Sequence, residues 1–114
     1  MTGATIDRAT FEALKKTTGA DFVDELVDTF LQEAPTMLDD LRRGLAAKDA
    51  DKFRRAAHSL KSNSNTFGAL TLGAMARELE LGGLAKVIES DGQPLDALAE
   101  EYSRVAAALT ELKT

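Results

Sequence analysis

A chain of 114 residues, with 44% hydrophobic and 29% charged residues, is expected to form one soluble, globular domain over residues 1–114. Because it contains no cysteine, disulfide bonds, thiolate nucleophiles and cysteine zinc sites are excluded. The net charge of −5 argues against a nucleic-acid partner, and the lack of any run of about eighteen apolar residues argues against a membrane span.

The first half of the chain is predicted to be helical, because alanine and leucine are frequent and no segment alternates in the strand pattern. Asp7 is expected to cap a short first helix that ends at Gly19, and a second helix is expected from Asp21. Pro35 fits the first turn of a third helix, where its missing N–H would have no helical partner in any case. The polar segment Lys48–Asp51 is predicted to be the turn that follows.

The second half continues in the same way. A fourth helix is expected to run to about Asn65, and a fifth to begin near Ala69. Ser90–Gln93 is predicted to be a loop, and Pro94 to open the last helix. Short connections place neighbouring helices antiparallel. We therefore predict an all-α fold, an antiparallel up-down four-helix bundle with a short N-terminal helix that caps one end.

His58 is the only histidine in the chain. At roughly 100° per residue, the buried stripe of its helix contains Phe53, Ala57 and Leu60, and His58 lies about 140° from Phe53, on the solvent side. This geometry alone leaves two interpretations open, a solvated surface histidine or a functional imidazole. A metal site is not expected, because there is no second histidine and no carboxylate at ligand spacing on that face.

The exposed strip around His58 is basic and polar. Between residues 51 and 67 there are four basic residues and one acid, a local balance of +3 in a chain of net charge −5. Such a surface suits a phosphoryl group or an acidic partner. The side chains at helical spacing from His58 are Arg54, Lys61 and Ser62. The candidate partner-binding residues on this helix are Arg54, Arg55, Ser62 and Asn65.

The segment AAHSLKSNSNTFGA, residues 56–69, resembles the signature of histidine-containing phosphotransfer (HPt) domains. The family pattern is a histidine, any residue, an aliphatic residue, a lysine, usually a glycine, and later a glycine–alanine pair. The corresponding residues here are His58, Ser59, Leu60, Lys61, Ser62, Gly68 and Ala69. Leu79–Glu80 matches a recurrent leucine–glutamate pair in the next helix. Ser62 stands where the family most often has glycine, which affects the choice of partner more than the function.

The resemblance implies a chemistry for these residues. His58 is implied to accept a phosphoryl group from a sensor histidine kinase or from an aspartate of a response-regulator receiver domain, and to pass it to another aspartate. Lys61 is implied to stabilise charge on the phosphoryl oxygens. Glu80 either orients Lys61 or is an ordinary surface carboxylate. No cofactor is implied on this chain, and magnesium is expected on the partner receiver domain.

Two other functions stay open at this point. An enzyme with its own active site is disfavoured, because the sequence has no glycine-rich phosphate loop and no second acid or base near His58. An interaction bundle in which His58 is incidental is the more serious alternative. The expected protein is a monomeric phosphocarrier without an ATP-binding or kinase site. Its first ten residues lack a signal-peptide pattern, which favours the cytoplasm, and Met1 favours a free-standing protein.

Overall fold

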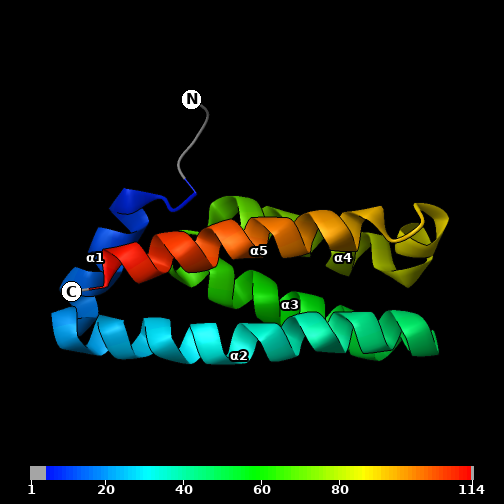
Figure 1. The fold of residues 1–114 in the computed structure, drawn as a ribbon, viewed down its shortest axis with the longest axis horizontal. Helices are drawn as coiled ribbons and strands as arrows, with labels where there is room; N and C mark the ends of the chain where they lie inside the picture. The colour runs from blue at the N-terminus through cyan, green and yellow to red at the C-terminus, as the bar shows by residue number, and fades with distance from the viewer. Residues whose placement is uncertain (1–4, 114) are drawn as a thin grey trace.

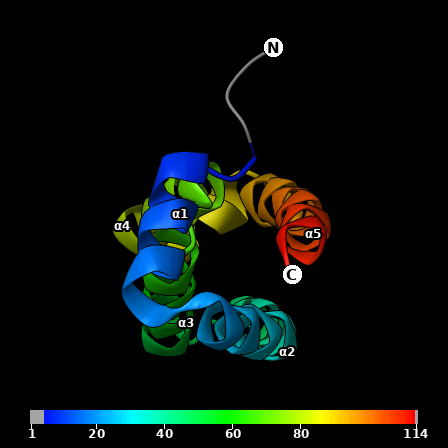
Figure 2. The ribbon, with the colours of Figure 1, turned by 90° about the vertical axis from the view of Figure 1, so that its left-hand side faces the viewer.

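The computed structural model describes residues 5–113, so Met1, which suggested a free-standing protein, lies outside the described residues. The helices are α1 (Arg8–Thr18), α2 (Ala20–Ala47), α3 (Ala50–Thr66), α4 (Leu70–Glu89) and α5 (Gln93–Leu112). The last four run alternately up and down, and α1 crosses one end of the bundle (Figures 1 and 2). The predicted all-α bundle with a short capping helix is therefore confirmed.

Pro35 does not begin a new helix, contrary to the prediction, and lies inside the 28-residue helix α2. The apolar stripe continues through it without a change of period, and its buried members are Val23, Val27, Phe30, Ala34, Leu38 and Leu41. Pro35 itself is exposed, so the carbonyl of Leu31, which loses its helical donor, lies on the solvent side of the helix. Burial of the continuous stripe outweighs the local cost of about 3 kcal/mol for an interior proline.

Helix α3 lies between α2 and α4 and packs against both. Gly44 of α2 permits a close approach, because a Cβ at this position would lie 3.0 Å from the backbone nitrogen of Phe53. Phe53, Ala57 and Leu60 are fully buried on the face that α3 turns to the core. The opposite face of α3 is left to solvent, and this face carries His58.

The glycine of the 56–69 segment has a structural role. Gly68 follows α3 with a φ of +86°, and a Cβ there would lie 2.7 Å from the carbonyl oxygen of Asp7. The Asp7 N–H donates to the Gly68 carbonyl at 2.7 Å, and the Asp7 carboxylate caps α1 by accepting from the Thr10 N–H at 3.1 Å. The start of α1 is thus attached to the connection between α3 and α4, which only glycine allows at this distance.

We expect Pro35→Ala to stabilise the protein by about 1–3 kcal/mol, because alanine restores the donor for the Leu31 carbonyl inside a helix. Urea denaturation monitored by circular dichroism measures the change. Pro94→Ala is the matched control, since Pro94 lies in the first turn of α5, where the lost donor matters little, and should shift stability by less than about 0.5 kcal/mol. Equal effects of the two substitutions would contradict the interior position of Pro35.

Candidate functional site

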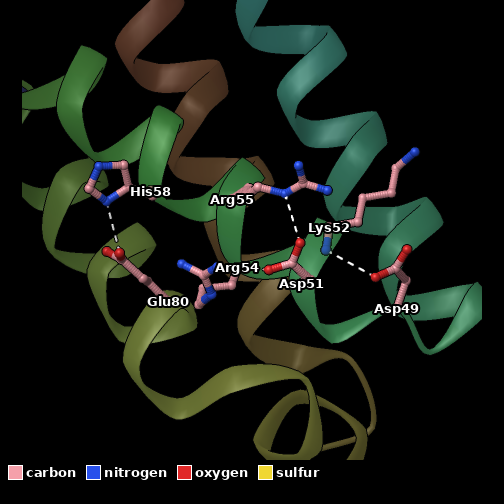
Figure 3. Close-up of polar contacts among 7 residues, drawn as sticks. All are labelled: Asp49, Asp51, Lys52, Arg54, Arg55, His58 and Glu80. Atoms are coloured by element: carbon pink, nitrogen blue, oxygen red, sulfur yellow. Dashed lines mark hydrogen bonds and ion pairs between the residues drawn. The ribbon is translucent and has the colours of Figure 1, made fainter.

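His58 projects from the exposed face of α3, as the helix geometry predicted, and its side chain is 56% exposed. It is not isolated on that face. Its Nδ1 lies 2.8 Å from Oε2 of Glu80, which α4 brings alongside α3 (Figure 3). The other carboxylate oxygen of Glu80, Oε1, lies 2.9 Å from Nζ of Lys61. One carboxylate from α4 therefore connects the imidazole and the ammonium group of α3.

The hydrogen bond to Glu80 determines where the histidine carries its proton. An ionised carboxylate can only accept, so Nδ1 must donate and must hold the hydrogen. In the neutral ring, Nε2 then keeps its lone pair, and it lies on the ring edge that faces away from Glu80 (Figure 3). In this neutral form, the unprotonated ring nitrogen lies on the edge turned away from Glu80.

Glu80 is well suited to remain ionised. The nearby Lys61 ammonium, and next the hydrogen bond to His58, hold the pKa of the Glu80 carboxyl below its ordinary value of 4.5. Because this pKa is lowered in the folded state, the carboxylate contributes its stabilisation fully above pH 4.5, and the contribution is lost as pH falls through the lowered value. At neutral pH the acceptor for the Nδ1–H is fully charged.

The other candidate residues are arranged differently. Arg54 and Arg55 both bind Asp51, with Arg54 Nη2 at 2.7 Å from Oδ1 and Arg55 Nε at 3.1 Å from Oδ2 (Figure 3). This pairing lowers the pKa of Asp51, through the Arg54 hydrogen bond first and the charge of Arg55 next. Ser62 is exposed, and Asn65 lies against Gly73 of α4 so closely that a Cβ there would overlap its amide.

The structure thus brings together His58, Lys61 and Glu80, and leaves Arg54 and Arg55 in a separate cluster around Asp51. The sequence left the role of Glu80 open, since its contact with His58 joins residues 22 positions apart on two helices. The recurrent Leu79–Glu80 pair was the one signal that pointed to it. Within residues 5–113, no three His, Cys, Asp or Glu side chains could share a metal ion, and no helix is long and apolar enough to cross a membrane.

We expect Glu80→Ala to change the tautomer of His58. In the wild-type protein, nitrogen-15 NMR of the ring should show hydrogen on Nδ1, because the carboxylate accepts it. Without the acceptor, the two tautomers should become mixed, with more hydrogen on Nε2. Lys61→Ala is the control, because it leaves the carboxylate beside the ring and should keep the hydrogen on Nδ1. A tautomer ratio unaffected by Glu80→Ala would contradict the role given to this hydrogen bond.

Comparisons with known proteins establish the family of this chain. Residues 25–112 match the model of the Hpt domain family. Sensor protein TorS of Escherichia coli (strain K12) is 32% identical over 93 residues, which are 80% of this chain and 9% of the length of that protein. The fold is similar to the crystal structure of histidine-containing phosphotransfer protein B (HptB) from Pseudomonas aeruginosa PAO1, with a TM-score of 0.89 and 24% identity over 98% of this chain and 96% of the other. The chain therefore belongs to the Hpt domain family.

Proposed function

We propose that His58 is the residue that carries the phosphoryl group, and that Nε2 is the atom that accepts it. The observation that supports this assignment is the 2.8 Å contact between Nδ1 and the Glu80 carboxylate. That contact places the ring hydrogen on Nδ1 and directs the lone pair of Nε2 to the exposed edge. An interaction bundle in which His58 is incidental gives no reason for such an arrangement.

The proposed reaction is a phosphoryl transfer between His58 and an aspartate of a receiver domain. The Nε2 lone pair attacks the phosphorus of the aspartyl phosphate, so that an Nε2–P bond forms as the bond from phosphorus to the aspartate oxygen breaks. The aspartate carboxylate leaves with the electron pair. Nδ1 keeps its hydrogen, and the ring becomes cationic, which the facing Glu80 carboxylate stabilises. The reverse reaction delivers the group to another aspartate.

Lys61 is proposed to act in two ways. Its ammonium keeps Glu80 ionised, since it is the main cause of the lowered pKa of that carboxyl. It also lies on the same side of α3 as His58, because both bind the same carboxylate. A positive charge at this place favours the negative charge that the phosphoryl oxygens bring. Lys61 is 24% exposed, so the surrounding protein screens part of it from water.

The proposed partners are response-regulator receiver domains and a sensor histidine kinase, each binding this protein as a monomer. Magnesium is proposed to reside on the receiver, where it would supply charge neutralisation during transfer. The receiver is proposed to dock over the exposed face of α3. The residues proposed for this surface are Arg54, Arg55, Ser62 and Asn65.

We expect His58→Gln to abolish phosphoryl acceptance while it leaves helicity and thermal stability nearly unchanged. The glutamine amide can still donate to Glu80, and exposed substitutions usually cost less than about 0.5 kcal/mol. The measurement is incubation with a receiver domain phosphorylated by acetyl phosphate, followed by mapping of acid-labile label. Acid-labile phosphate on the folded variant would show that another residue is the carrier.

We expect Ser62→Trp to block transfer from a receiver while small donors still react. Ser62 lies one turn from His58 on the exposed face, so a large ring there would keep the partner's aspartate away from Nε2. Phosphoramidate, which needs no docking surface, should label His58 normally. Ala107→Trp is the matched control, because Ala107 is exposed on α5, which does not pack against α3 within residues 5–113. Normal receiver-dependent transfer by Ser62→Trp would exclude this face as the docking surface.

A further inference from the structure

Besides Lys61 of α3, the exposed Arg77 of α4 is a second cation near the candidate site. Two of its residues contact α3 on the side near solvent, Gly73 through Asn65 and Glu80 through His58 and Lys61. Arg77 follows Gly73 by four positions and precedes Glu80 by three, so it lies on the same face of α4. Unlike those two contact residues, Arg77 is exposed. It therefore borders the junction of α3 and α4 from the solvent side.

The antiparallel packing of the two helices places Arg77 along α3. Glu80 is level with His58, and Gly73 is level with Asn65. Arg77 lies between Glu80 and Gly73, so by the same register it is level with Lys61, about one turn from His58. The exposed surface around the imidazole thus extends from α3 onto α4, and Arg77 is the cation on the α4 half.

The charges on this surface are not equally available to a partner. Lys61 is paired with Glu80, and Arg54 shares Asp51 with a neighbouring arginine. Among residues 5–113, no carboxylate forms an ion pair with Arg77. Its guanidinium can bind an incoming anion without first breaking a contact within the protein.

Arg77 also lies between two exposed leucines. Leu81 is 67% exposed and follows it by four positions, and Leu70 is 49% exposed and precedes it by seven. These spacings put all three side chains on one outer stripe of α4. Large exposed apolar side chains around an arginine are typical of the central part of a protein interface. The stripe is therefore suited to a protein surface that combines apolar residues with an acid.

We propose that Leu70, Arg77 and Leu81 form the α4 half of the receiver docking surface, with Arg77 bound to a carboxylate at the rim of the receiver's phosphorylation site. This inference rests on the proposed function of His58. Transfer brings the receiver's aspartate to Nε2, and a bound magnesium ion requires further carboxylates or similar oxygen ligands around that aspartate. An acidic rim centred on Nε2 extends over Arg77, while the flanking leucines contact apolar residues of the receiver.

The test compares Arg77→Glu with Arg42→Glu, which makes the same change in net charge. Arg42 is exposed on α2, two residues from Gly44, so it does not share the face through which α2 meets α3. The donor is a receiver domain from the same organism, loaded with acetyl phosphate and selected by its transfer to the wild-type protein. For Arg77→Glu we expect KM for this receiver to rise by about tenfold to a hundredfold, with kcat unchanged. Arg42→Glu should stay within about twofold of wild type, and Leu81→Ser should raise KM by about threefold to tenfold.

Labelling by phosphoramidate separates this inference from the function on which it rests. If phosphoramidate fails to label His58 in the wild-type protein, or no receiver transfers to it, the proposed function itself is wrong. If His58 is labelled but Arg77→Glu keeps a normal KM, or if Arg42→Glu raises KM equally, the docking role is overturned. A fall in kcat or in phosphoramidate labelling of Arg77→Glu also overturns it, since Arg77 would then act on the phosphoryl group rather than on the partner.

Discussion

The close packing of α3 against α4 is the constraint on which the candidate site depends. Gly73 has no side chain, so α3 approaches until the Asn65 amide lies over the glycine. The connection between the helices is equally tight, with the Ala69 N–H donating to the Ser64 carbonyl at 2.9 Å. At this separation a glutamate on α4 reaches both the imidazole and the ammonium of α3. A Cβ at Gly73 would displace the amide of the exposed Asn65 side chain from this position.

Charge around His58 is organised in compensated groups. Glu80 neutralises Lys61, and Asp51 offsets one of the two charges of Arg54 and Arg55. The +3 balance that the sequence suggests for this helix is therefore distributed rather than concentrated on the histidine. Exposed ion pairs contribute little to stability, so their main effect here is on geometry.

The residues of the 56–69 segment divide into two kinds. Gly68 serves the fold, because its positive φ and the close approach of Asp7 exclude a side chain. Leu60 is fully buried and fixes the rotation of α3 about its axis. His58 and Lys61 are held at the surface by that rotation and by Glu80. A short pattern in the sequence therefore combines the residues that orient the helix with the residues that the helix presents.

The sequence by itself determined the features that depend on neighbours along the chain. Caps and apolar periodicity placed most helix ends and turned His58 outward, because helix formation and burial of a stripe involve residues within a few positions of one another. Local rules failed at Pro35, where burial of the stripe that continues on both sides of Pro35 outweighed the preference of proline for a helix start. Only the tertiary structure decided that Glu80 meets His58, 22 positions away, since this contact depends on how closely and in which register two helices pack. The position of Arg77 level with Lys61 was decided in the same way, because spacing along one helix says nothing of what lies level with it on the next.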